Sequence, residues 1–487
     1  MVRVKWMKRR GGRSLLIFRY ILYCAGIWIH LLVMTGMLAV LGCGPGGAKS
    51  SFEVEKNDAD GGFMGKEPWG SERGEKERWK RERSDAKGKK ESNGGNKQNK
   101  ETKKDPVIRV LLMTNGYQGI QHSRAELVSP AGMILEAGEE RWQVEGGQSL
   151  SITPGDERVK DKIVRVWAKD GGEITVNSID RAYGKPSYEG TVEIRCGTNG
   201  LILINELPVE RYLCKVVPSE MPPSYELEAL KVQAVCARSY AYRQMASYGY
   251  PEYEAHVDDS TAYQVYGNSQ LQERSTQAVN ATCGEVVMYH GQIATTYYYS
   301  TSCGETTSLE AWGTPVNDEN GYLQAVEVSG KVGDYEKDLP WYRWEAAIPV
   351  QTLSTLVEQN LGKGLGMIRD IQVTKKGPGG VVLQIKLIGE NGDATVDTEN
   401  KIRAALGGNG YEIKKQDGGV VPSSKLLPSA FFTVEKGADI FLIKGGGYGH
   451  GIGMSQNGAN EMAKEGRSYE EIVEFFFRGA KVQMGTG

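Results

Sequence analysis

Glu220 is a candidate residue for acid–base chemistry. It lies in the run Val-Val-Pro-Ser-Glu-Met-Pro-Pro, residues 216–223, where most neighbours are apolar. An apolar setting disfavours the charged form of a carboxyl group and raises its pKa. Such a group can deliver a proton to a leaving oxygen near neutral pH, as a general acid does. The pattern leaves a second interpretation open, in which Glu220 caps or stabilises the start of the following helix.

The stretch GGGYGHGIGMSQ, residues 445–456, is too rich in glycine for an ordinary helix or strand. Glycine permits positive φ and a close approach of the backbone to another group. The stretch contains no Lys, so it is not a Walker-type phosphate loop. We expect His450 to lie in a cleft, although a ligand role or a buried, hydrogen-bonded position is also open. Ser455 and Gln456 are its expected companions, and without a Gly-x-Ser-x-Gly elbow we do not expect a Ser nucleophile.

A long helix after Glu220 must position this part of the chain. Apolar residues recur there at alternating steps of three and four, which describes one face of a helix, namely Leu227, Leu230, Ala234, Ala237 and Ala241. Its start is marked by a proline pair, a candidate cap and two acidic residues near the positive end of the dipole, namely Pro222, Pro223, Ser224, Glu226 and Glu228. Further helices are predicted at residues 350–361 and 468–478, the second capped by Ser468.

Before this helix, residues 106–213 alternate short β-rich runs with Gly, Pro and Asn turns. The pattern predicts an antiparallel β unit, with strands in the runs VIRVLLM, GMILEA, QSLSIT, IVRVWA, EITVNS, TVEIRC and GLILINEL. Residues 214–487 are predicted to form a mixed α/β catalytic unit that holds the long helix and the glycine-rich motif. The expected fold class is therefore α+β, with an antiparallel β-rich unit followed by a mixed α/β unit.

The N-terminal part predicts a membrane anchor and a stalk. We expect residues 1–20 to form a basic cytoplasmic tail, and residues 21–41 are an apolar run long enough to span a bilayer. Because positive charge stays cytoplasmic, we expect a single pass through the cell membrane, with the rest of the chain outside. The alternatives, a cleaved signal peptide or a lipoprotein site at Cys43, also leave the protein outside. The composition of residues 42–105 predicts a disordered, charged stalk.

The charge distribution argues against nucleic acid as a partner. Residues 1–105 carry 23 Lys and Arg against 13 Asp and Glu, while the whole chain has a formal net charge of −2. Residues 106–487 are therefore net acidic, whereas phosphate contacts need a clustered basic surface.

The seven Cys residues contain no CxxC pair, so they match no zinc-ribbon spacing. Five of them lie within residues 106–487, and we expect these to be buried free thiols, namely Cys196, Cys214, Cys236, Cys283 and Cys303. A disulfide between Cys283 and Cys303 is the alternative in an oxidising compartment.

Three parts of the sequence stand out in order along the chain. They are VVPSEMPPSYELEALKVQAVCARSYAY at residues 216–242, DDSTAYQVYG at 258–267 with TTYYYSTSCGETTS at 295–308, and GGGYGHGIGMSQNGANEMAKEGRSYEEIVEFFFRGA at 445–480. Together they resemble the stage II sporulation protein D and amidase-enhancer family. The likeness extends over most of the region from about residue 107 to the end.

The resemblance implies a lytic transglycosylase that cleaves peptidoglycan glycan strands after an amidase has stripped their stem peptides. The family's catalytic residue matches Glu220. In lytic cleavage the C6 hydroxyl of muramic acid attacks the anomeric carbon and leaves a 1,6-anhydro end, so one residue can be both base and acid. Ordinary glycosidases use two carboxylates, and for a hydrolytic reaction Asp258 or Asp259 would be the second.

The resemblance also implies a setting and partners. The setting is the mother-cell side of the septum of a sporulating bacterium during engulfment. The expected partners are peptidoglycan glycan strands, a cell-wall amidase, other engulfment-complex membrane proteins, and the membrane through the N-terminal helix.

Four further side chains are candidates for contact with sugar. Arg238 and Tyr240 lie on the helix after Glu220, and similar positions recur in the family; holding the glutamate and structural pairing inside the domain are the alternatives. Gln264 and Tyr266 offer polar and flat aromatic surfaces suited to sugars, with core or sheet packing as the alternative.

The resemblance does not extend to a metal site. Some relatives bind zinc through two cysteines and a histidine around the block that matches residues 256–264. Asp258 and Tyr263 occupy the corresponding places here, although His256 remains, so a zinc site would lack its thiolates. We expect no metal and no cofactor. A fallback metal set, whose spacing fits no common pattern, is Cys283, His290 and Cys303.

Two other functions stay open. The chain could be a non-catalytic peptidoglycan-binding module that recruits or activates a cell-wall amidase, because enzymes and modules of this family share their motifs. A membrane-anchored adhesin or structural protein is the more remote alternative. The presence of Glu220 favours the enzyme.

Overall fold

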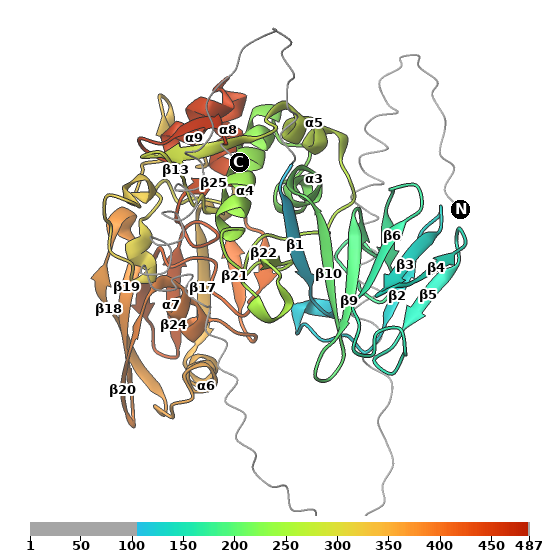
Figure 1. Ribbon diagram of the computed structural model, residues 1–487. Helices are drawn as coiled ribbons and strands as arrows, with labels where there is room; N and C mark the ends of the chain where they lie inside the picture. Colours follow the sequence, from blue (N-terminus) through green and yellow to red (C-terminus); the bar gives the residue numbers. More distant parts are fainter. Residues whose placement is uncertain (1–104, 486–487) are drawn as a thin grey trace, which may run out of the picture. The chain divides into compact units, whose positions relative to one another are not determined.

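The computed structural model describes residues 105–485 (Figure 1). The predicted cytoplasmic tail, membrane anchor and all but the last residue of the stalk lie outside these residues. Among the residues described, no helix combines the length and the apolar character that a membrane crossing requires. The chain contains both helices and several sheets, which confirms the α+β fold class.

The first part of the described chain builds two sheets. A seven-stranded sheet has the order β11-β1-β10-β9-β6-β3-β4, and a four-stranded sheet has the order β5-β2-β7-β8. Neighbouring strands are antiparallel except β11, which runs parallel to β1. The strands of the two sheets are β1 (Val107–Leu112), β2 (Ala125–Val128), β3 (Met133–Ala137), β4 (Glu140–Val144), β5 (Ser149–Ile152), β6 (Val164–Ala168), β7 (Ile174–Val176), β8 (Ser187–Tyr188), β9 (Thr191–Cys196), β10 (Leu201–Pro208) and β11 (Val257–Asp258).

All seven predicted β-rich runs form strands, so that part of the prediction is confirmed. The sequence reading missed β2, β4 and β8. β4 has an exposed or half-buried side chain at every position, so its sequence ERWQV lacks the apolar alternation that reveals a half-buried strand.

Three helices follow these sheets, α3 (Val209–Glu220), α4 (Leu227–Gln244) and α5 (Glu273–Ala281). α4 packs against α3, α5, α8 and α9, and Figure 1 shows it lying among them. Its alanines allow this close packing because a small side chain lets neighbouring backbones approach. The predicted cap is wrong: Glu226, not Ser224, is the N-cap residue of α4, and its own side chain makes no capping hydrogen bond.

A second hydrophobic core lies between residues 344 and 443. It is built from a five-stranded sheet of order β22-β21-β17-β24-β23, a three-stranded sheet of order β18-β19-β20 and two helices. The predicted helix at 350–361 is confirmed as α6. The bounds are β17 (Trp344–Pro349), α6 (Val350–Leu361), β18 (Ile368–Lys376), β19 (Val382–Gly389), β20 (Gly392–Asp397), α7 (Glu399–Leu406), β21 (Glu412–Lys415), β22 (Val420–Pro422), β23 (Phe432–Lys436) and β24 (Ile440–Gly445).

The end of the chain returns to the first core, which contains side chains from Ile108 to Ala480. The predicted helix behind Ser468 is confirmed as α9, where Ser468 and Glu471 form a capping box. The remaining elements are β12 (Glu285–Tyr289), β13 (Gln292–Ile293), β14 (Tyr298–Tyr299), β15 (Ser329–Gly330), β16 (Gly333–Asp334), β25 (Met454–Ser455), α8 (Gln456–Lys464), α9 (Tyr469–Phe476) and β26 (Lys481–Met484). This core is continuous across residues 213 and 214, and the division of the chain there stays a prediction.

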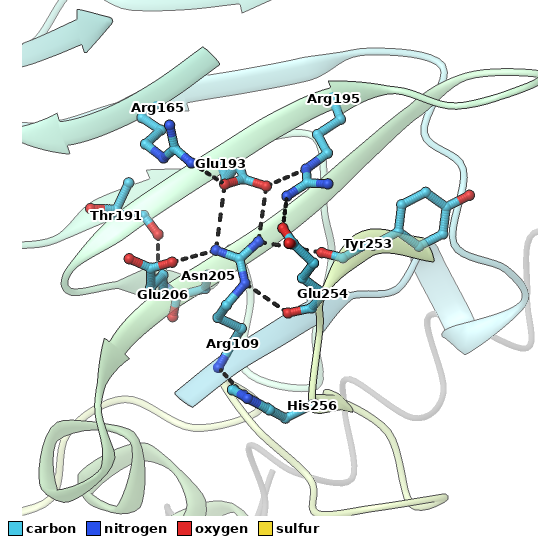
Figure 2. A network of polar contacts seen from close by, with 10 residues as sticks. All are labelled: Arg109, Arg165, Thr191, Glu193, Arg195, Asn205, Glu206, Tyr253, Glu254 and His256. Carbon is cyan, nitrogen blue, oxygen red and sulfur yellow. Dashed lines mark hydrogen bonds and ion pairs between the residues drawn. The ribbon is translucent and has the colours of Figure 1, made fainter. Parts of the chain in front are cut away.

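A charged network ties the seven-stranded sheet to the segment that leads into β11 (Figure 2). Glu193, on β9, is 1% exposed and pairs with three arginines, namely Arg109, Arg165 and Arg195. Burial would raise the pKa of Glu193, but the arginines outweigh burial and lower it. Arg109 also donates to the carbonyls of Tyr253 and Glu254, and its backbone N–H donates to His256. The network therefore fixes the backbone just before residues 258–267.

Candidate active site

Glu220 is the last residue of α3. The C-terminus of a helix carries partial negative charge, which disfavours a carboxylate there. The interpretation in which Glu220 caps the following helix is not supported, because Glu226 takes that place. Glu220 is half-buried, so part of its surface remains open to solvent.

The Glu220 carboxyl group has two hydrogen-bond partners from later parts of the chain. The backbone N–H of Val265 donates to its Oε1 at 2.7 Å, and the hydroxyl of Tyr298 bonds to the same carboxyl group. Burial raises the pKa of Glu220 to about 7, and the two hydrogen bonds lower it by less than burial raises it. Near neutral pH the group therefore populates both protonation states, as a residue acting in turn as acid and base requires.

Gln264 orients Tyr298 toward Glu220. Its Oε1 accepts from the Tyr212 hydroxyl at 3.2 Å, while its Nε2 donates to the Ala237 carbonyl at 3.3 Å and to Tyr298 Oη at 3.1 Å. Because the Ala237 carbonyl can only accept, the amide nitrogen must lie on this side, and Tyr298 Oη is an acceptor toward it. The Tyr298 proton is then free to point at Glu220. Gln264 is 1% exposed, so it is placed to position Tyr298 rather than to meet a sugar.

Tyr266 and Arg238, both predicted to contact sugar, are fully buried. The Tyr266 hydroxyl donates to Asn205 Oδ1 at 2.6 Å. Arg238 forms a two-pronged pair with Glu210, with both distances 2.6 Å, and donates to the Glu285 carbonyl at 3.0 Å. Tyr266 therefore matches the alternative of core packing, and Arg238 matches the alternative of structural pairing inside the domain.

Tyr240 is half-buried, with its ring centroid 6.2 Å from that of Tyr297. Of the four further side chains predicted to contact sugar, Tyr240 is therefore the one with exposed surface left for a ligand.

His450 is held by its backbone surroundings. Its Nδ1 accepts from the N–H of Ile452 at 3.0 Å, so its Nε2 carries the proton and donates to the Tyr298 carbonyl, also at 3.0 Å. Burial and the charge of Arg403 lower the pKa of His450 to about 3, so the ring stays neutral. Both nitrogens are used, which leaves only the ring surface for a substrate.

The glycine-rich motif packs against the segment that carries Tyr298. Gly451 and Gly453 have φ of +82° and +78°, and a Cβ on Gly453 would lie 2.3 Å from the Tyr297 carbonyl oxygen. The expected positive φ and close approach are thus confirmed. β25 then pairs in parallel with β14, Tyr298 opposite Met454.

Ser455 and Gln456 join the motif to the rest of the site. Gln456 Nε2 donates to the Glu220 carbonyl at 3.1 Å and to Gln233 Oε1 at 3.2 Å. Ser455 caps α8 through the N–H of Gly458 and donates to Glu336 Oε1 at 2.8 Å. Their contacts hold the backbone of the site.

Glu336 is a second buried carboxyl group, and the sequence reading missed it. It is 0% exposed and accepts from the backbone N–H of Ser302 at 3.0 Å, from the Ser302 hydroxyl and from Ser455. Burial raises its pKa to about 7 despite these hydrogen bonds. The surrounding sequence, Gly-Asp-Tyr-Glu-Lys-Asp, reads as a polar loop and gives no signal of burial.

Asp258 and Asp259 are buried and occupied by partners of their own. Asp259 pairs with Arg181 and accepts from the N–H of Met113 at 2.9 Å. Asp258 accepts from the Tyr250 hydroxyl at 2.6 Å and from the N–H of Ser260 at 2.8 Å. These contacts fix the loop that delivers Val265.

Within residues 105–485, no three His, Cys, Asp or Glu side chains gather closely enough to hold a metal ion. All five cysteines of this part of the chain are free thiols, so the alternative Cys283–Cys303 disulfide is absent. The expectation of burial is confirmed for Cys214 and Cys236. It is wrong for Cys196 and Cys283, which are exposed, and Cys303 is intermediate.

Comparison with known proteins places this site in a family. Residues 197–289 match the family described as stage II sporulation protein, and residues 301–453 match a domain of unknown function. Stage II sporulation protein D of Bacillus subtilis is 30% identical over 295 residues, 57% of this chain and 75% of that protein. An uncharacterized protein of Brachyspira hyodysenteriae is 30% identical over 298 residues, 61% and 72% of the two chains. The amidase enhancer of B. subtilis is 30% identical over 292 residues, 54% of this chain and 39% of that protein.

Proposed function

Because this chain belongs to the stage II sporulation protein D family, we propose that it is a peptidoglycan lytic transglycosylase with Glu220 as catalytic acid and base. The observation that carries the proposal is the state of this carboxyl group. It is half-buried, its pKa is raised to about 7, and Val265 and Tyr298 hold it. A carboxyl group that titrates near neutral pH can give up and regain a proton within one reaction cycle.

In the proposed reaction, protonated Glu220 gives its proton to the glycosidic oxygen as the bond from that oxygen to C1 of muramic acid breaks. The C6 hydroxyl of the same sugar attacks C1, and the Glu220 carboxylate takes the hydroxyl proton. The net change moves one proton from O6 to the leaving oxygen, so Glu220 ends protonated and no water is consumed. The hydrogen bonds from Val265 and Tyr298 stabilise the carboxylate between the two transfers.

Contacts within the chain also support a mechanism that uses a single catalytic carboxyl group. Asp258 and Asp259, the candidates for a hydrolytic second carboxylate, are buried against Tyr250 and Arg181. Glu336 is enclosed by Ser302 and Ser455. A general base that activates water needs an open path to the sugar, and these three groups are better placed to hold loops.

The biological setting is part of the proposal. We place the chain at the cell membrane through residues 21–41, with the N-terminus cytoplasmic and the described residues outside, on the mother-cell side of a sporulation septum. The substrate is a glycan strand stripped by a cell-wall amidase. The family name and a relative named amidase enhancer support the link to sporulation and to an amidase.

The same relative favours a second candidate function, a binding module that activates an amidase without cutting glycan. To separate the two, the full chain, purified in detergent, and its Glu220→Gln variant are incubated with stripped glycan strands and the products weighed by mass spectrometry. We expect anhydro-muramic ends from the wild type and a loss of about 10²–10⁴-fold in the variant. Reducing ends would mean hydrolysis. An absence of products, together with full stimulation of an amidase by both proteins, would establish the binding module.

A further inference from the structure

Most of the side chains predicted to meet sugar are turned inward, so a glycan needs contact surface beyond them. Tyr266 and Gln264 are buried. Yet the glycine-rich motif carries one aromatic side chain that is not, since Tyr448 is 42% exposed. It belongs to the same motif as His450 and Gln456, which contact Tyr298 and Glu220. Because a tyrosine combines an apolar ring with a polar hydroxyl, this exposed ring in a motif that otherwise faces inward is a candidate binding surface.

Tyr448 pairs with a second aromatic ring to form a surface that we call the aromatic platform, residues Trp341 and Tyr448. The two ring centroids are 4.7 Å apart, and the half-buried Trp341 supports the exposed Tyr448. The backbone beneath is fixed, because Gly447 donates to the Trp341 carbonyl at 2.9 Å. Tyr448 and Thr301 exchange two backbone hydrogen bonds of 2.8 and 3.1 Å. A platform held in this way loses little conformational freedom when a ligand binds.

The chain itself limits how far the platform can lie from the candidate catalytic group. Thr301, the backbone partner of Tyr448, is three residues beyond Tyr298, and three residues span at most about 11 Å when fully extended. Tyr298 in turn bonds to Glu220. The backbone at Thr301 therefore lies within about 11 Å of that at Tyr298, close enough for the platform to serve as a neighbouring sugar subsite.

One cation adjoins the platform, and a second lies beside Tyr342, the residue that follows Trp341. The Lys415 ammonium lies 5.6 Å from the centroid of the Trp341 ring, and the Arg343 guanidinium lies 3.9 Å from that of Tyr342. Arg343 is exposed and uses only Nη1 in its hydrogen bonds, to the carbonyls of Cys303 and Tyr342. The acidic neighbours are Asp417, at 3.9 Å from Lys415, and Asp334, which accepts from the Tyr342 hydroxyl. Arg343 thus keeps donors for an anionic ligand.

We propose that the aromatic platform, with Arg343 and Lys415, binds a muramic acid residue of a stripped glycan strand. The sugar ring packs on Tyr448 and Trp341, and the lactyl carboxylate faces the two cations. In a strand with stem peptides this carboxylate is an uncharged amide, so the subsite distinguishes stripped from intact strands by charge. The inference rests on the proposed function in that it takes peptidoglycan glycan as the ligand.

The test measures binding of the full chain in detergent, with Glu220→Gln in every protein so that no ligand is cut. Isothermal titration uses a stripped glycan oligomer and chitotetraose, which lacks the lactyl carboxylate. We expect Tyr448→Leu and Trp341→Leu each to weaken binding of both ligands by about tenfold. Arg343→Gln with Lys415→Gln should weaken only the stripped oligomer, and this difference should vanish at about 1 M salt, where charges are screened within ~3 Å. Tyr183→Leu, at a tyrosine 74% exposed outside the platform, is the matched control and should change nothing.

Unchanged affinity in the platform variants, with melting temperatures equal to that of the parent, would overturn the subsite. Equal losses of affinity for both ligands in the variant that combines Arg343→Gln and Lys415→Gln would overturn the proposal that these cations bind the lactyl carboxylate. The proposed reaction is tested separately by the products of the protein with Glu220 intact. If the protein binds glycan through the platform but makes no anhydro ends, the subsite proposal would stand and the proposed transglycosylase activity would be excluded.

Discussion

The side-chain amide of Gln456 donates a hydrogen bond to the backbone carbonyl of Glu220 at 3.1 Å, across 236 residues of sequence. This contact joins the end of α3 to the start of α8. The carboxyl group of Glu220 is held separately, by Val265 and Tyr298. Motifs far apart in the chain therefore meet at one residue, and the contacts to its carboxyl group can be tested by their effect on its protonation.

Glycan cleavage should depend on pH with a loss above neutrality. The raised pKa of Glu220, about 7, means that its acid form dominates below pH 7 and disappears as the pH rises. Because protonated Glu220 starts the proposed reaction, we expect the rate on a soluble stripped oligomer to fall about tenfold for each pH unit well above 7. Initial rates between pH 5 and 9 check this. A rate that holds constant to pH 9 would show that Glu220 is not the acid.

Replacing Tyr298 should move this pH profile. The Tyr298 hydroxyl lowers the pKa of Glu220, so in Tyr298→Phe the pKa should rise and the fall in rate should shift to higher pH, with a lower maximal rate. Tyr299→Phe is a matched control, because the neighbouring Tyr299 hydroxyl is buried without a hydrogen-bond partner. Identical profiles for the two variants would exclude Tyr298 from setting the protonation of Glu220.

Glu336 should make the fold less stable at higher pH. Its folded pKa of about 7 lies above the ordinary 4.5, so between these values the folded state binds more protons and its stability decreases as the pH rises. A Gln at this position can place its oxygen where Oε1 accepts and its amide toward the Ser302 hydroxyl, which mimics the protonated acid.

We therefore expect Glu336→Gln to match the wild type at pH 5 and to melt at a higher temperature at pH 8. Differential scanning calorimetry of both proteins at the two values measures the effect, and Glu435→Gln, at an exposed carboxylate, serves as the control. A variant that tracks the wild type at both values would count against a protonated Glu336.

We expect Arg238 to contribute to the stability of the fold and not to sugar binding. Replacing it with Met leaves Glu210 without its buried partner, a kind of change that typically costs about 3–5 kcal/mol. Arg124→Met, at an exposed pair with Glu126, should cost less than about 1 kcal/mol. Urea unfolding gives both values. If Arg238→Met instead kept its stability and raised the KM for glycan, the residue would be a substrate contact after all.

The sequence was informative wherever local pattern decides structure. The seven β-rich runs and the helix at 350–361 follow from alternation and periodicity. The capping box behind Ser468 is likewise local, since its two partners are three residues apart. The prediction that Ser224 caps the helix was wrong. Ser224 is a good capping residue beside a proline pair, but the helix begins only at Leu227.

Side-chain roles at the site were less predictable because they depend on partners distant in sequence. Gln264 and Tyr266 have the chemistry of sugar contacts, and only the fold shows that both are buried. Tyr298 lies in a run of three tyrosines, and which of them faces Glu220 is set by the pairing of β14 with β25. Glu336 carries no local signal at all, since its burial results from the return of residues 454–460 to the first core.

The partners that fix Glu220 all come from chain that is made after it. A ribosome extends the chain from the N-terminus, so α3 and its glutamate exist long before Val265, Tyr298 and Gln456 emerge. Contacts this distant in sequence also form late, because loop closure must precede them. An unfinished chain thus carries the glutamate without the surroundings that set its acidity. Under the proposed function, competence for catalysis arrives only after Gln456 has been made, which is a built-in delay for a protein proposed to cut its own cell's wall.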